Sequence, residues 1–269
     1  MACIPFRTMV SIITPCYNSS TYICETIRSI QKQTYTNWEL IIVDDHSTDN
    51  SVEKIKELAK GDSRIRLIEL KERVGMAEAC NIAIESAKGH YLSFIQSHDL
   101  WAPHKLERQL EFMEIKNIAF CYTNYQFIDE NSHFYEPPVK MPEKITYQDL
   151  LKNITAIGCL TVMIDLYKVG KIKMMNDQNI PADNALWLSI LKRGFKGYRV
   201  NEVLAYRRKT TSTLVRNNYK EATKFWYLYR NVEKLNIFIA AYCLMNHVKN
   251  EAKFSKHTIK KDAQTSTQA

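Results

Sequence analysis

The sequence predicts an α/β fold built on a mostly parallel sheet. From Met9 onward, short β-rich runs alternate with amphipathic helical patterns. Three strand-helix-strand units fall within the first hundred residues, and such crossovers join parallel strands. With 269 residues, of which 45% are hydrophobic, the chain can form one α/β domain, alone or with a helical appendage.

Apolar, β-branched runs predict the strands of the first half, and apolar residues at helical spacing predict the helices between them. The expected strands are 9–15, 38–45, 64–70 and 90–95, and the expected helices are 21–33, 51–60 and 75–88. Ser47, Thr48 and Asp49 are candidate caps of the second helix. Right-handed crossovers place the carboxyl ends of these strands along one edge, where such sheets bind ligands.

The second half predicts a less regular continuation. A helix over 103–116 and a strand over 118–128 precede a proline-containing loop over 129–146. A second module then begins at Tyr147, with a short helix, a strand near 159–164, a helix around 183–192 and strands near 197–207. Residues 217–254 predict one long or broken helix, and the polar residues 255–269 predict a disordered tail.

Charge is unevenly distributed along the chain. Residues 1–191 carry 20 basic and 24 acidic side chains, whereas residues 192–269 carry 17 basic and 5 acidic ones. A basic, aromatic C-terminal part could bind substrate phosphates, an anionic membrane surface or nucleic acid. Charge alone does not distinguish among these partners. Because no RNP, KH or helix-turn-helix pattern is present, nucleic-acid binding is not expected.

Cysteine usage and the absence of export signals predict a cytoplasmic protein. The 7 cysteines are scattered without a CxxC pair, which indicates buried thiols in a reducing compartment. The first residues lack a secretory-signal pattern, and the longest apolar stretches are shorter than the roughly 20 residues of a spanning helix. These features are also compatible with a protein that contacts the inner face of a membrane.

Four polar clusters follow predicted strands and are candidates for the site. They are Thr14–Asn18, Asp44–Ser47, Gln96–Asp99 and Ala182–Asp183. A nucleotide base needs a flat apolar face, which Tyr17 offers, and Asp45 can accept the N3–H of uracil, a donor that cytosine lacks.

The first two clusters therefore suit a UDP-sugar. Thr14 and Pro15 would line the same pocket, with Asp44 beside Asp45. The alternative is structural: the two aspartates would form a helix cap and a solvated neighbour, and Tyr17 would be a core aromatic.

These motifs resemble a known family in their order and spacing. The run ITPCYNSSTYICETIRSIQKQTYTNWELIIVDDHSTDNS resembles the opening of the inverting glycosyltransferases with the GT-A fold, family 2. The resemblance continues through RVGMAEACNIAIESAKGHYLSFIQSHDLWAPHKLE and, more weakly, ADNALWLSILKRG and LAYRRKTTST. The resemblance covers roughly residues 8–215 and implies a Rossmann-like nucleotide-sugar-binding half over 1–128 and an acceptor-binding half over 129–215. Beyond it, the residue pattern predicts an aromatic and basic helical segment over 216–254 and a tail over 255–269.

The third cluster departs from the pattern of this family. Relatives have D-x-D-D, whose carboxylates hold a divalent cation against the diphosphate, whereas this chain has Gln96, Ser97, His98 and Asp99. Gln is a poor ligand for Mg²⁺, while His98 suits Mn²⁺ and Asp99 adds an anionic oxygen. The resemblance thus implies a divalent cation on His98 and Asp99, Mn²⁺ rather than Mg²⁺, with Ser97 at the donor. The alternative is a solvated His98 in a chain that has lost the metal.

Two basic residues are candidates for donor contacts. Relatives carry Arg where this chain has Cys80, and Arg73 could supply a cation from nearby. The segment Tyr206–Ser212 matches a loop that orders over the donor phosphates in relatives, where Arg207 would neutralise the diphosphate. Both could instead be solvated loop charges.

The fourth cluster supplies the catalytic candidate. The resemblance implies that Asp183 deprotonates the acceptor hydroxyl, and an inverting displacement needs only one such general base. The alternative is that Asp183 caps a helix over 184–193.

The resemblance implies a hexosyl- or N-acetylhexosaminyl-transferase that moves a sugar from a nucleotide sugar, UDP-linked, to a glycan or lipid-linked oligosaccharide in surface polysaccharide biosynthesis. A non-catalytic relative that binds a nucleotide sugar or a partner enzyme is the alternative, because of Gln96 and Cys80. The helical stripe in 219–250 either packs on its own domain or a partner subunit, or contacts a membrane through Trp226 and Tyr227 with the nearby basic residues.

Overall fold

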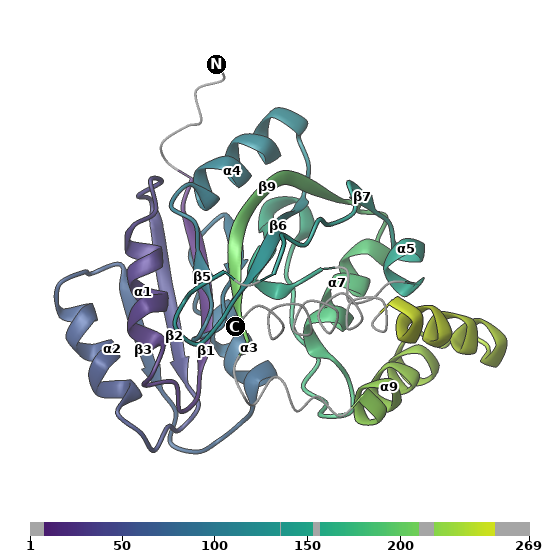
Figure 1. Ribbon diagram of the computed structural model, residues 1–269, viewed down its shortest axis with the longest axis horizontal. Helices are drawn as coiled ribbons and strands as arrows, with labels where there is room; N and C mark the ends of the chain where they lie inside the picture. Colours follow the sequence, from purple (N-terminus) through teal and green to yellow (C-terminus); the bar gives the residue numbers. More distant parts are fainter. Residues whose placement is uncertain (1–7, 135, 153–156, 210–217, 251–269) are drawn as a thin grey trace, which may run out of the picture.

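The computed structural model describes residues 8–134, 136–152, 157–209 and 218–250 (Figure 1). Its strands are β1 Val10–Cys16, β2 Trp38–Asp44, β3 Ile65–Glu69, β4 Tyr91–Phe94, β5 Leu100–Trp101, β6 Phe120–Ile128, β7 Lys144–Ile145, β8 Met163–Asp165 and β9 Gly197–Arg208. Its helices are α1 Ile23–Gln31, α2 Ser51–Lys60, α3 Met76–Glu85, α4 Lys105–Lys116, α5 Tyr147–Lys152, α6 Leu166–Val169, α7 Ala182–Lys192 and α9 Asn218–Tyr227. A 3₁₀ turn at Cys159–Thr161, a π-helical turn at Leu228–Val232 and a helix over 237–250 complete the described elements.

The described strands form one sheet in the order β3-β2-β1-β4-β8-β6-β9-β5, with β7 beside β9. The first four strands pair in parallel, as expected from their sequence pattern. Because the strand order reverses at β1, right-handed crossovers place α3 on the opposite face from α1 and α2. All seven residues of β2 are buried, which follows from cover on both faces. The reversal between β1 and β4 is the position at which such sheets bind ligands.

The second half of the sheet is mixed. β8 lies antiparallel between β4 and β6, and β6 pairs in parallel with β9. The strand expected near 159–164 is shorter than predicted because Cys159–Thr161 form a 3₁₀ turn, so that pairing begins at Met163. The strands expected near 197–207 form a single strand, β9, with irregular pairing to β6 around Asn124.

Aromatic packing holds α7 against the centre of the sheet. Trp187 is fully buried, with its ring centroid 5.5 Å from that of Phe94 on β4 and 5.6 Å from that of Phe120 on β6. Eight of the eleven residues of α7 are buried, which is typical of a helix that is apolar on most sides. The start of α7 is therefore held rigidly beside the carboxyl end of β4.

The C-terminal segment is a broken helix, which was one of the two expected forms. Phe225 and Tyr229 are buried, and the Tyr229 hydroxyl donates to the carbonyl of Leu151 at 2.9 Å. Among the helices of the described ranges, none combines the length and the apolar character needed to cross a bilayer. The expected tail over 255–269 lies outside the described residues. The six cysteines within them are free thiols.

Candidate active site

A buried carboxylate anchors the loop that follows β3. The Asp45 side chain, only 5% exposed, accepts the backbone N–H groups of Val74 at 2.6 Å and Gly75 at 2.9 Å. Gly75 has a φ of +90°, a conformation that glycine adopts without the strain a side chain would bring. The end of β2 is thereby linked to the start of α3.

The same loop brings Arg73 onto Tyr17. The guanidinium carbon of Arg73 lies 3.9 Å from the Tyr17 ring centroid, and its Nε lies 4.0 Å from Oδ2 of Asp45. Tyr17 is 38% exposed, so an aromatic surface, a carboxylate and a cation lie together at the sheet edge. The structure thus brings Tyr17, Asp45 and Arg73 into one cluster, which we call the donor cluster. Such a group can stack a base and bind its polar edge.

The other candidates on β1 and β2 lie around this cluster. Asp44 is buried and accepts both the N–H and the hydroxyl of Ser47, at 2.9 Å and 2.5 Å. Its carboxylate therefore braces the turn after β2. Thr14 is also buried, and its Oγ1 has no hydrogen-bond partner among the described residues, whereas Pro15 lines a pocket on the other side of the strand.

The altered motif after β4 places two candidate metal ligands side by side. His98 Nε2 lies 3.9 Å from Oδ1 of Asp99, and the same Asp99 oxygen accepts the backbone N–H of Arg208 at 2.9 Å. Burial raises the pKa of Asp99, although His98 and the neighbouring arginines act in the opposite direction. Ser97 is buried, and its hydroxyl lies 2.6 Å from that of Ser19 after β1.

These two ligands fit a cation that is shared with a substrate. In the described part of the chain, no three His, Cys, Asp or Glu side chains are arranged around a common metal position. A hard divalent cation often takes only one or two protein ligands and completes its shell with water and phosphate oxygens. His98 and Asp99 match that requirement, whereas Gln96 lines the pocket described below.

Arg208 holds this motif in place, a role that the sequence analysis missed. Its buried side chain donates Nε to the carbonyl of His98 at 2.9 Å and pairs with Glu25 at 2.8 Å. It also donates to the carbonyls of Asp129 and Glu130, at 2.9 Å and 3.1 Å. Nothing in the local pattern distinguishes it from Arg207, because only the alternation of β9 decides which of the two arginines points inward.

Arg207 lies among the acidic groups of the site. Burial lowers the pKa of Arg207, but the Tyr125 hydroxyl and the negative charges of Asp99 and Asp183 outweigh it, so that the pKa is raised. The guanidinium is therefore a permanent cation near Asp99 and Asp183. Lys209, from the same expected phosphate loop, pairs with Glu136 at 2.6 Å, and residues 210–212 lie outside the described ranges.

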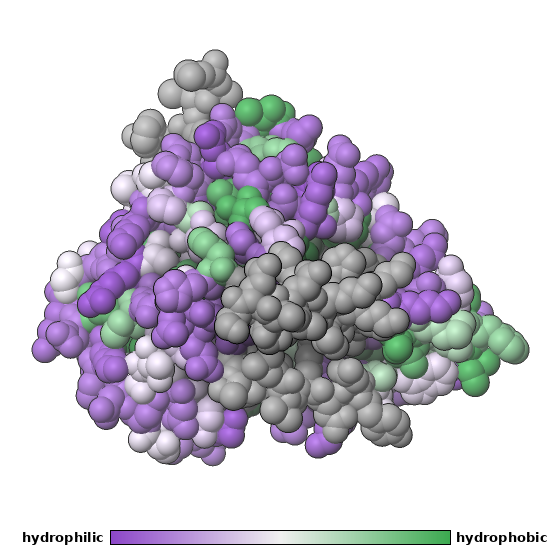
Figure 2. Space-filling view, viewed as in Figure 1, coloured by the Kyte–Doolittle hydropathy of each residue, from purple (hydrophilic) through white to green (hydrophobic). Residues whose placement is uncertain are grey.

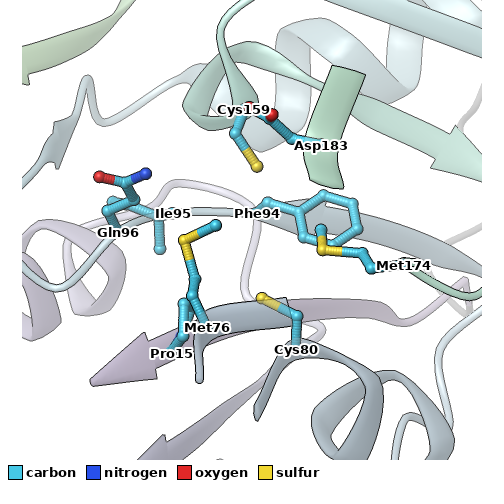
Figure 3. A pocket seen from close by; sticks show the side chains of 9 residues that line it. All are labelled: Pro15, Met76, Cys80, Phe94, Ile95, Gln96, Cys159, Met174 and Asp183. Atoms are coloured by element: carbon cyan, nitrogen blue, oxygen red, sulfur yellow. The ribbon is translucent and has the colours of Figure 1, made fainter. Parts of the chain in front are cut away.

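A pocket opens between the carboxyl end of the sheet and the start of α7 (Figure 3). Nine residues line it: Pro15, Met76, Cys80, Phe94, Ile95, Gln96, Cys159, Met174 and Asp183. Asp183 is the only carboxylate among them. Burial, together with the charge of Asp183, raises the pKa of Cys80 to about 12 and that of Cys159 well above its usual value. Both thiols are therefore neutral side chains, and Asp183 brings the one carboxylate to the lining of this pocket.

Asp183 is not the cap of α7. The helix begins at Ala182, its N-cap is Pro181, and no side chain makes a capping hydrogen bond. Asp183 lies in the first turn, where its Oδ1 accepts the backbone N–H of Asn184 at 2.8 Å. The capping alternative from the sequence is therefore wrong, and the half-buried carboxylate faces the pocket.

Asn81 stabilises the opposite wall of the pocket. The sequence motif draws attention to the neighbouring Cys80 and gives no role to Asn81. The Asn81 amide donates to the carbonyl of Met174 at 3.0 Å and accepts its N–H at 2.7 Å. This pair joins α3 to the segment that leads into α7. Met76 follows Gly75 directly, and Pro15 lies at the end of β1. Because both residues line the pocket, the pocket borders the donor cluster.

Comparison with known sequences identifies relatives over most of the chain. A sequence profile described as glycosyl transferase family 2 matches residues 11–166. TuaG of Bacillus subtilis (strain 168), named as a glycosyltransferase of teichuronic acid biosynthesis, is 42% identical over 248 residues, 92% of this chain and 98% of TuaG. WfgD of Escherichia coli, named a UDP-Glc:alpha-D-GlcNAc-diphosphoundecaprenol beta-1,3-glucosyltransferase, is 37% identical over 245 residues, 89% of this chain and 92% of WfgD.

Solved structures share the fold. TarS 1-349 of S. aureus in complex with UDP-GlcNAc aligns with a TM-score of 0.68 at 18% identity, over 89% of this chain and 71% of that one. The mannosyltransferase PcManGT of Pyrobaculum calidifontis, in complex with GDP-Man and Mn²⁺, aligns with a TM-score of 0.64 at 17% identity, over 98% of this chain and 81% of that one. The expected α/β fold, with a central sheet, flanking helices and a helical C-terminal part, is confirmed, although the sheet as a whole is mixed and not mostly parallel.

Proposed function

Because the chain belongs to glycosyl transferase family 2, we propose that it transfers a sugar from a UDP-sugar to a hydroxyl group of a lipid-linked glycan, with inversion at the anomeric carbon. That the chain is a glycosyltransferase follows from the family and from relatives that match nearly its whole length. The donor, the acceptor and the stereochemistry are argued below from the residues of the site.

The donor cluster suits uracil. The ring of Tyr17 offers a stacking surface, and Asp45 keeps lone pairs beyond those used by Val74 and Gly75, because a carboxylate has about four acceptor positions. One of them can accept the N3–H of uracil. The UDP complexes of TarS and the UDP-Glc in the name of WfgD support the same donor class.

One observation carries the catalytic proposal. Asp183 is the one carboxylate among the nine residues that line the pocket, and this pocket borders the donor cluster. Asp183 accepts the proton of the acceptor hydroxyl as the acceptor oxygen bonds to the anomeric carbon. The bond from that carbon to the diphosphate oxygen breaks on the opposite face, and its electron pair leaves with the diphosphate. One general base is sufficient for this displacement.

His98 and Asp99 would hold a divalent cation at the diphosphate. The cation would supply positive charge against the leaving group, and the imidazole of His98 favours Mn²⁺ over Mg²⁺. Arg207 adds a permanent cation from β9. Ser97, held by Ser19, places the backbone of this motif beside the loop after β1.

The acceptor is proposed to be a glycan on a diphosphate lipid, at the inner face of the membrane. The name of WfgD specifies an acceptor of this kind, and the basic C-terminal part of the chain suits an anionic lipid environment.

Thermal unfolding with a panel of nucleotide sugars, with and without Mn²⁺, tests the donor and the metal together. We expect UDP-sugars to raise the melting temperature and Asp45→Ala to abolish that rise. A GDP-sugar that protects better than any UDP-sugar would overturn the donor proposal. A protein that binds its donor but transfers to no lipid-linked or free glycan would favour the non-catalytic alternative.

A further inference from the structure

The helix over 237–250 carries apolar side chains on two opposite faces. Ala240, Cys243 and His247 are buried against the rest of the protein, and the ring centroid of His247 lies 4.1 Å from that of Phe225 on α9. The opposite face carries large apolar side chains that are exposed: Ile237, Phe238, Tyr242, Met245 and Val248. At about 100° per residue, these five occupy an arc of roughly 140°, which we call the outer face.

The outer face is exposed to an unusual degree for side chains of this size. Phe238 is 84% exposed and Met245 is 55% exposed. The helix lies at the edge of the molecule (Figure 1), and the space-filling view shows apolar surface at that end (Figure 2). Contiguous exposed apolar side chains of this kind mark a surface that another phase or molecule covers.

Charge indicates what covers it. Lys234 precedes the helix and Lys249 lies in its last turn, both exposed. The sequence from 249 to 261 carries five lysines and one glutamate. A second copy of this chain would bring the same positive charge to the contact, whereas an anionic lipid surface attracts it.

We propose that the outer face of helix 237–250 rests on an anionic lipid bilayer. An amphipathic helix of this kind lies parallel to the membrane plane, with its apolar side chains among the headgroups and the adjoining acyl carbons. Because the inner face stays packed on α9 through His247, the contact requires no unfolding of the domain.

This surface differs from the membrane contact that the sequence leaves open as an alternative. The sequence offers a membrane contact through Trp226 and Tyr227 as the alternative to packing on the domain or a partner subunit. In the structure Tyr227 is exposed, but Trp226 is half-buried and Phe225 is buried, so that α9 packs mainly on its own domain. The larger group of exposed apolar side chains lies one helix further along the chain. The membrane contact itself does not depend on the proposed function. Only its purpose does, because a membrane-bound enzyme would meet a lipid-linked acceptor.

Sedimentation of the full chain with vesicles tests the proposal. We expect binding to vesicles of phosphatidylcholine and phosphatidylglycerol, and a loss of about tenfold or more in the partition coefficient for Phe238→Glu/Met245→Glu, because both carboxylates would have to enter the interface. The matched control is Ile115→Glu/Tyr167→Glu, which changes two exposed apolar side chains elsewhere, at 64% and 81% exposure, and should bind as the wild type does.

Equal vesicle binding by the outer-face variant and the wild type would overturn the proposal. A wild-type dimer in sedimentation equilibrium that the same variant dissociates would also overturn it and would assign the outer face to a second copy. UDP-sugar binding measured without lipid should be unchanged in both variants. If that binding is absent in the wild type while the vesicle result holds, the proposed function fails and the membrane surface stands.

Discussion

The guanidinium carbon of Arg73 lies 3.9 Å from the centroid of the Tyr17 ring, although the two residues are separated by the whole of β2 and β3. Asp45 holds this contact in place through the backbone of Val74 and Gly75. The donor cluster is therefore held together by contacts within the protein itself. A base that stacks on Tyr17 meets a cation at the same ring, next to the position expected for the diphosphate.

Arg73→Ala should weaken UDP binding by about 5- to 20-fold, because a cation that stacks on an aromatic ring and faces a phosphate contributes roughly 1–2 kcal/mol. The melting temperature without ligand should change little, since the Arg73 side chain is 63% exposed. Isothermal titration with UDP gives the affinity directly.

Arg64→Ala is the matched control for Arg73→Ala. The Arg64 guanidinium carbon lies 3.7 Å from the Trp38 ring centroid, and the side chain pairs with Asp62 at 2.7 Å. Trp38 is the first residue of β2, at the opposite end of that strand from Asp44. It should leave UDP affinity unchanged. Equal UDP affinity in Arg73→Ala and the wild type would remove Arg73 from the donor site.

His98→Ala should lose most of the Mn²⁺ dependence of UDP binding. The fold should persist, because Arg208 contacts the backbone carbonyl of His98 and not its ring. Titration of Mn²⁺ into EDTA-treated protein with UDP measures the effect. His90→Ala, which removes a His–Asp pair of 2.9 Å with Asp165, is the control and should respond to Mn²⁺ normally. Full transfer activity of the wild type in EDTA would contradict the metal assignment. Arg207 would then be the group that neutralises the diphosphate.

Lys105 should make the stability of the protein rise with pH. Burial lowers the pKa of Lys105 to about 7, from 10.5 for the exposed side chain, and its hydrogen-bond partners Ser93 and Gln109 are neutral. Between these two pKa values the unfolded chain binds a proton that the folded protein does not bind. The free energy of unfolding therefore increases with pH in this window.

Lys105→Met removes this dependence. Relative to the variant, the wild type should gain about 2 kcal/mol in the free energy of unfolding between pH 7 and pH 9, since one pKa unit corresponds to about 1.4 kcal/mol. Urea unfolding at both pH values measures the difference, with the exposed Lys60→Met as the control. A constant difference between wild type and Lys105→Met would show that Lys105 stays charged in the folded protein.

The sequence pattern predicted the first half of the fold well because its signals are local. Each parallel strand is a continuous apolar run, and each helix between them has its own apolar stripe. The polar residues at the strand ends then had to lie along one edge, which is why Tyr17 and Asp45 could be placed together in advance. The contact of Arg73 with both residues depends on the path of one loop and was not predictable in detail.

The second half depends on contacts between distant segments. The insertion of β8 between β4 and β6 leaves no trace in the local pattern, because any short apolar run can pair in either direction. The buried role of Arg208 and the link from Asn81 to Met174 likewise need the assembled structure. Asp183 could be named from its motif, but only the structure shows that Pro181 takes the N-cap position.

Single-turnover kinetics of Asp183→Asn, with donor affinity measured in parallel, test the central assignment most directly. The amide keeps the size of the side chain and its ability to accept the N–H of Asn184, but it has no useful basicity. We expect the variant to keep near-native UDP-sugar affinity and melting temperature, while its transfer rate falls by about 10²–10⁴-fold. Transfer that persists in proportion to the folded fraction of the variant would contradict it and reduce Asp183 to a structural residue.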